Sequence, residues 1–172
     1  MTQPQRPRPP AVLAELRRYR ATGGHGLPDH LTLAGLRPLP GGRNNTVYAW
    51  TPAPGRDTQI IKLYKDGERG RGEREWAALV ALHAARPGDA PAPLWADLDH
   101  PRPAIGMSRL PGVPLPELDT GRYGTALPAL AALHRRIHHM PIPGALAKVP
   151  RAGSWAHPAA HRRVADRTRR RR

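Results

Sequence analysis

Hydrophobic and polar residues alternate in three consecutive short segments, a pattern typical of strands with one buried face. The segments are residues 31–39 (LTLAGLRPL), 46–51 (TVYAWT) and 58–64 (TQIIKLY). Their connections contain Gly41-Gly42 and the segment PAPGRD, and both compositions are typical of tight turns. The pattern therefore predicts a meander of three antiparallel strands.

Other segments carry apolar residues at helical spacing. Residues 11–24 predict a short helix that stops at a Gly-Gly pair, residues 70–85 predict a longer helix, and residues 127–140 predict an amphipathic one. Two more apolar segments, 93–100 and 103–110, predict a fourth and a fifth strand. From about Pro141 onward the hydrophobic periodicity fades.

Composition excludes several classes of protein. The 172 residues contain no Cys, so disulfides and thiolate metal sites are excluded. The first twenty residues hold no long apolar run, and no segment is long and apolar enough to span a bilayer. We expect a cytoplasmic protein without a membrane partner.

The net charge of +15 raises the alternative of a nucleic-acid-binding protein. Residues 151–172 alone carry eight Arg against one Asp, and this Arg-rich tail would bind nucleic acid without sequence specificity. However, only three of the 28 basic residues are Lys and Phe is absent, a bias that a GC-rich gene would produce by itself. Deletion of the chain after Pro150 would distinguish this alternative from a nucleotide-binding protein. It should abolish nucleic-acid binding through the tail and leave nucleotide binding unchanged.

Two charged residues in the first half of the chain require partners. By strand alternation Ile60, Lys62 and Tyr64 share one face, so the Lys62 ammonium lies among apolar neighbours. Glu75 lies four residues before Leu79 and therefore borders the apolar side of its helix. We expect Lys62 and Glu75 to form an ion pair that leaves the ammonium positioned for an anion.

The glycine turn has two interpretations. Gly41 and Gly42 are followed by Asn44 and Asn45, the only Asn residues in the chain. The segment fits a simple hairpin turn, and it also fits a loop whose backbone N–H groups bind phosphate. Asn tolerates the unusual backbone conformations that either turn requires.

The order of these motifs resembles the aminoglycoside phosphotransferase and choline kinase-like family, which has a protein-kinase-like fold. GGRNNTVYAW resembles its phosphate loop, IIKLY its lysine strand, and EREWAALVAL its glutamate helix. AIGMSRLPGVPL resembles the strand and hinge between its two lobes, and LAALHRRIH resembles the first helix of its larger lobe. The resemblance covers about residues 31–140.

The resemblance implies an α+β fold, and together with the patterns above it divides the chain into four regions. Residues 1–30 would form an N-terminal extension with a short helix. Residues 31–110 would form a protein-kinase-like small lobe, a five-stranded antiparallel sheet plus one helix. Residues 111–140 would hold the hinge linker and the first helix of a truncated large lobe, and residues 141–172 a basic, disordered tail.

The resemblance also implies an ATP site. The loop residues Gly41, Gly42, Asn44 and Asn45 would cover the phosphates. Lys62 would bind the α- and β-phosphates, with Glu75 orienting it, and Ile60 would pack on the adenine ring. The hinge backbone, including Met107, Ser108 and Leu110, would contact the adenine edge.

The residues that perform transfer in this family have no counterpart in the chain. No Asn follows Asn45, and after Asp119 the only Asp is Asp166, so a catalytic Asp, a catalytic-loop Asn and a second Mg²⁺-binding Asp are all missing. We expect no phosphate transfer by this chain alone. A frameshift or truncation, a large lobe supplied by another chain, and a retained nucleotide-binding module are the three explanations, and we favour the first. The acceptor, a small molecule, would bind only where a large lobe is supplied.

Three histidines, His134, His138 and His139, lie at helical spacing near the end of the last predicted helix. The first two could share a metal ion, but no Glu or third ligand accompanies them at a recognisable spacing. A structural or solvent-exposed role is the better interpretation.

Overall fold

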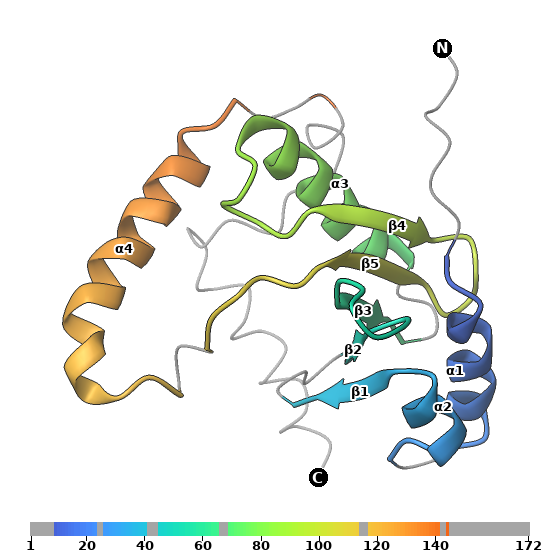
Figure 1. Cartoon of the computed structure of the whole chain (residues 1–172). Helices are drawn as coiled ribbons and strands as arrows, with labels where there is room; N and C mark the ends of the chain where they lie inside the picture. Colours follow the sequence, from blue (N-terminus) through green and yellow to red (C-terminus); the bar gives the residue numbers. More distant parts are fainter. Residues whose placement is uncertain are drawn as a thin grey trace, which may run out of the picture.

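The computed structural model describes residues 9–23, 26–40, 45–65, 69–113, 117–141 and 144. Within these residues the chain forms the predicted five-stranded antiparallel sheet, and helices lie on both of its faces (Figure 1). The elements are α1 (Val12–Ala21), α2 (Asp29–Leu33), β1 (Leu36–Leu39), β2 (Thr46–Trp50), β3 (Gln59–Leu63), α3 (Arg69–Ala85), β4 (Pro93–Asp97), β5 (Ala104–Ser108) and α4 (Thr120–His138).

Strand β3 lies at the centre of the sheet, whose order is β1-β2-β3-β5-β4. Strands β1, β2 and β3 form the predicted meander, and β5 then pairs with the other edge of β3. Lys62 is flanked in register by Val47 on β2 and Ile105 on β5. A lysine in the central strand therefore has a fixed backbone.

The two faces of the sheet bury different sets of side chains. Helices α1 and α2 cover one face, where Leu16, Leu31 and Ile61 are fully buried in one cluster. Helix α3 covers the other face, where Leu79 packs with Ile105 and other residues of a second cluster. The alternation along β3 assigns Ile61 to the first face and Lys62 to the second.

The first predicted strand is partly wrong. Residues 31–33 of the expected strand 31–39 belong to helix α2, and β1 begins only at Leu36. Pro28 precedes the helix in an extended conformation, and Asp29 places a carboxylate in its first turn, where negative charge is favourable. Gly35, at a φ of +87°, then turns the chain from α2 into β1. The turn allows a short helix to precede the strand within a segment that has strand-like alternation.

Helix α1 is fastened to the β4–β5 hairpin by Arg17. Its guanidinium Nη1 lies 2.6 Å from Asp97 Oδ2, and its Nε and Nη2 donate to the Arg102 carbonyl oxygen at 3.0 and 2.7 Å. The Arg17 side chain is only 10% exposed. The segment expected as an N-terminal extension thus contributes Leu13 and Leu16 to the core of the sheet.

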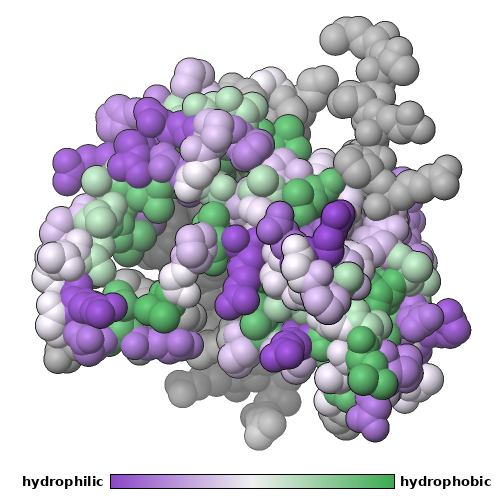
Figure 2. Space-filling model, viewed as in Figure 1, coloured by the Kyte–Doolittle hydropathy of each residue, from purple (hydrophilic) through white to green (hydrophobic). Residues whose placement is uncertain are grey.

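Helix α4 stands away from the sheet (Figure 1). It begins at Thr120, earlier than predicted, where the Asp119 side chain accepts a hydrogen bond from the Arg122 N–H, and it continues through Pro128. Leu127 is 52% exposed and Leu130 37% exposed. Hydrophobic side chains line the side of α4 that faces the rest of the molecule (Figure 2). No helix of the described part of the chain is long and apolar enough to cross a membrane.

A paired contact joins α4 to the α3–β4 loop. Arg136 Nε and Nη2 donate to the two oxygens of Asp89, both at 3.1 Å. These hydrogen bonds hold the pKa of the Asp89 carboxyl below its ordinary value. A lowered folded-state pKa means that the contact stabilises the fold above the unfolded pKa of Asp, about 3.9, and is lost as the pH falls further.

We therefore expect the Arg136 Nε–H resonance to change as the pH is lowered from 7 to 2. Two-dimensional NMR of the arginine side chains would follow it, with Asp89→Asn as the control in which the change disappears. An Arg136 resonance that does not respond to pH in the unsubstituted chain would contradict this assignment.

Candidate nucleotide-binding site

The centre of the site is the contact between Lys62 and Glu75. Lys62 projects from β3 toward α3, and its Nζ donates to both Glu75 carboxylate oxygens at 2.6 Å. The expected ion pair is therefore confirmed. The two side chains are 23% and 31% exposed, so the pair is partly shielded and still open to a ligand from solvent.

The ammonium has the chemistry of an anion-binding group. It carries three N–H donors and no acceptor. Glu75 offsets the charge of the ammonium and fixes its direction. The Lys62 side chain therefore has less conformational entropy to lose when a ligand binds. Within the described part of the chain, Lys62 is the charged residue of the central strand β3.

The role of Tyr64 in this site was not predicted from the sequence. Its hydroxyl donates to Glu75 Oε2 at 2.6 Å, and its ring centroid lies 5.4 Å from the Lys62 Nζ. Tyr64 is 1% exposed. The signal was present, because alternation along β3 already assigned Tyr64 to the face of Lys62.

The residues expected around the base lie beside this trio. Ile60 is two residues before Lys62 on the same face, it is paired in register with Met107, and both belong to the cluster beneath α3. Met107 is 8% exposed, whereas Ile60 is partly exposed. These two side chains form an apolar surface next to the charged pair.

The strand that leads to the hinge extends to Ser108. The Ser108 N–H donates to the Ala92 carbonyl oxygen and its Oγ accepts from the Ala92 N–H, so both groups are used within the fold. Leu110 follows the strand and is 46% exposed. Hinge contacts to a base through Met107, Ser108 and Leu110 stay a prediction.

The expected phosphate loop falls mostly outside the described residues. Gly41, Gly42 and Asn44 lie there, so the choice between a hairpin turn and a phosphate loop stays open. Asn45 is described as a half-buried bend residue immediately before β2. Because Thr46 is paired with Leu63, Asn45 lies beyond the end of β3, two residues before Val47, the register partner of Lys62.

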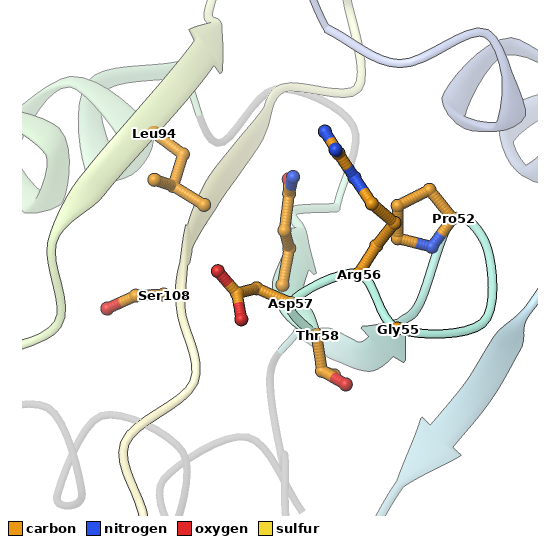
Figure 3. Close-up of a pocket in the computed structure, with 8 residues that line it drawn as sticks. Pro52, Gly55, Arg56, Asp57, Thr58, Leu94 and Ser108 are labelled. Carbon is orange, nitrogen blue, oxygen red and sulfur yellow. The ribbon is translucent and has the colours of Figure 1, made fainter.

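A hollow of about 400 Å³ lies at the turn between β2 and β3 (Figure 3). Asp57 extends from that turn toward the strand that carries Ser108, while Arg56 extends away (Figure 3). Of the expected site residues only Ser108 lines this hollow, and neither Lys62 nor Glu75 does. The hollow is therefore separate from the charged pair.

The histidines provide no metal centre in the part of the chain that is described. No group of three metal-ligating side chains occurs there, and the rings of His134 and His138 are 6.2 Å apart between centroids. His139 Nδ1 lies 2.7 Å from the Arg135 carbonyl oxygen, at the end of α4. The third histidine thus contacts its own helix terminus.

A five-stranded antiparallel sheet whose central-strand Lys is paired with a helix Glu is the small lobe of a protein-kinase-like phosphotransferase. The sequence supports the same class. Residues 35–172 match the model of the phosphotransferase enzyme family, APH, and the chain belongs to this family. No curated protein and no solved structure matches the chain.

The family match reaches further along the chain than the resemblance did. It includes residues 141–172, where sequence analysis expected a disordered tail and favoured an out-of-frame product. A loss of family character after Met140 is therefore not confirmed. These residues lie outside the described part of the chain, apart from Pro141 and Gly144, and so does the Arg-rich segment on which the nucleic-acid alternative rests.

Proposed function

We propose that this chain binds ATP as the nucleotide-binding lobe of a small-molecule phosphotransferase. The observation that carries the proposal is the Lys62–Glu75 ion pair on the central strand, with both carboxylate oxygens 2.6 Å from the ammonium. Lys62 would bind the α- and β-phosphates and Glu75 would hold its ammonium. Ile60 and Met107 would pack against the adenine.

The chemistry of these residues fits a nucleotide. A partly exposed ammonium attracts a polyphosphate, and the neighbouring apolar surface suits a purine ring. When bound, ATP would supply the phosphoryl group that complete members of this family transfer to a hydroxyl of the acceptor. Every residue named here acts in binding.

The proposal separates binding from transfer. No Asn follows Asn45 in the 172 residues and the only Asp after Asp119 is Asp166, so the Mg²⁺ ligands and the catalytic Asp of the family's pattern have no counterpart in these residues. This chain alone would bind nucleotide without transferring its phosphate. A small-molecule acceptor would bind only where a large lobe is supplied, for example by another chain. If the lobe is missing through truncation, no acceptor would bind.

Lys62→Ala should weaken ATP binding by roughly 10- to 100-fold, the usual effect of losing a charge-assisted hydrogen bond to a ligand. Isothermal titration calorimetry with MgATP and with adenosine would measure it. Adenosine binding should change little, because adenosine has no phosphate. The loss should also shrink at high salt, which screens the attraction.

Lys65→Ala is the matched control, since Lys65 is an exposed lysine three residues further along the chain. It removes the same charge from the protein and should leave ATP affinity unchanged. Equal losses of ATP affinity in the two variants would mean that only the net charge of the protein matters, which would contradict a specific role of Lys62. An unsubstituted chain that fails to bind ATP would refute the proposal.

A further inference from the structure

Tyr64 contacts both members of the charged pair. Its hydroxyl donates to Glu75 Oε2 at 2.6 Å, and its ring lies 5.4 Å from the Lys62 Nζ, within the range of a cation–π contact. Glu75 thus accepts from the ammonium through both carboxylate oxygens and from the phenol through Oε2. Because Oε2 also accepts from this phenol, the carboxylate has less freedom to rotate away from Lys62.

The burial of the three side chains identifies which one is the anchor. Tyr64 is 1% exposed, whereas the Lys62 and Glu75 side chains are 23% and 31% exposed. A partly exposed ion pair between long side chains is easily exchanged for contacts with water. The buried phenol supplies the fixed point to which the exposed pair is attached.

The backbone of α3 comes close enough for this contact because Gly72 has no side chain. A Cβ placed on Gly72 would lie 3.5 Å from Tyr64 Cε2 and 3.2 Å from Leu98 Cδ2. Glu75 follows Gly72 by about one helical turn and therefore lies on the same side of α3. The close approach of helix and sheet sets the distance that the Tyr64 hydroxyl must span.

We propose that Tyr64 is a positioning residue for the Lys62 ammonium and that it acts through Glu75. The proposal rests on the proposed function, since the ammonium is positioned for nucleotide phosphates. In this role Tyr64 acts without contacting the nucleotide itself. Its hydroxyl restrains the Glu75 carboxylate, and the carboxylate in turn holds the ammonium in the direction from which phosphate binds.

The alternative is that Tyr64 only fills the core beneath α3. Tyr64→Phe separates these roles, because it keeps the ring, its packing and its face toward the ammonium while it removes the hydroxyl. We expect Tyr64→Phe to weaken ATP binding roughly three- to tenfold, as for one hydrogen bond to a charged group acting indirectly, and to leave adenosine binding unchanged.

Tyr48→Phe is the matched control. Tyr48 is also 1% exposed, but it lies on the other face of the sheet in the cluster beneath α1 and α2. Burial raises the pKa of its phenol above the ordinary value, so it too is a desolvated tyrosine. This control should bind ATP as the unsubstituted chain does, and an equal loss there would overturn the proposal.

A double-mutant cycle with Glu75→Ala tests whether Tyr64 acts through Glu75. In a chain that already carries Glu75→Ala, Tyr64→Phe should weaken ATP binding no further. If the two losses simply multiply, the hydroxyl acts independently of the carboxylate and the proposal is overturned.

A measurement without nucleotide keeps this proposal distinct from the proposed function. The chain has three lysines, so the ¹⁵N signal of the Lys62 ammonium can be assigned by comparison with Lys62→Ala. Tyr64→Phe should shift this signal and speed its exchange with water, and Tyr48→Phe should not. An unchanged signal in Tyr64→Phe overturns the positioning role, whereas a changed signal in a chain that does not bind ATP refutes only the proposed function.

Discussion

Replacing Gly106 by alanine should destabilise the fold by about 2–4 kcal/mol, the scale of a forced overlap in a packed core. Gly106 lies in β5, and a Cβ built on it would lie 2.1 Å from Trp95 Cε2 and 2.2 Å from Trp95 Nε1. The indole cannot easily move away. Trp95 is 3% exposed, and its Nε1 donates to Gln59 Oε1 at 3.0 Å.

Urea unfolding followed by far-UV circular dichroism would measure the loss in Gly106→Ala. Gly124→Ala is the matched control, because Gly124 lies in α4 and a Cβ there meets nothing within 4 Å. Alanine should be neutral or stabilising by up to about 1 kcal/mol at that helical position. Equal unfolding midpoints for Gly106→Ala and the unsubstituted chain would contradict the packing described for β4 and β5.

Leu16→Ala should cost about 2–5 kcal/mol of the free energy of unfolding, the range observed for a buried leucine truncated in a core. Leu16 has no exposed surface, and it packs from α1 into a cluster that includes Ile61 of the central strand. The loss is large beside a total stability of about 5–15 kcal/mol for an ordinary domain.

The same urea experiment on Leu33→Ala gives the control for a leucine truncation. Leu33, in α2, is 87% exposed, and its substitution should change stability by less than about 0.5 kcal/mol. Similar losses for the two leucines would mean that α1 does not pack as described. A selective loss for Leu16 would show that the sheet needs α1 for its stability.

These expectations bear on the site as well as on stability. Ile61 and Lys62 are neighbours on β3, and their side chains point to opposite faces of the sheet. Helix α1 therefore packs on the face of the sheet that carries Ile61, while α3 packs on the opposite face and places Glu75 beside Lys62. The Arg17 contact to Asp97 and Arg102 holds α1 in that place.

Local sequence patterns were sufficient for most elements. The segments that became β2, β3, β4, β5 and α3 have consistent propensity, periodicity and flanking turn residues, so local and global preferences agree. The segment at residues 31–33 was predicted wrongly because its alternation is equally compatible with one helical turn after Pro28. The start of α4 was placed too late because Pro128 is usually read as a helix boundary.

The sequence by itself determined the order of the five strands and of α1, α3 and α4, the face of β3 that carries Lys62, and the pairing of that lysine with Glu75. These depend on the two-residue period of a strand and on the cost of leaving a charge without a partner, and both act over short distances along the chain. Only the tertiary structure decided that the Tyr64 hydroxyl reaches Glu75, that Gly106 makes room for Trp95, and that α1 belongs to the core. Each of these contacts joins residues whose separation is set by how helices and strands pack in three dimensions, and no periodicity in the sequence encodes that distance.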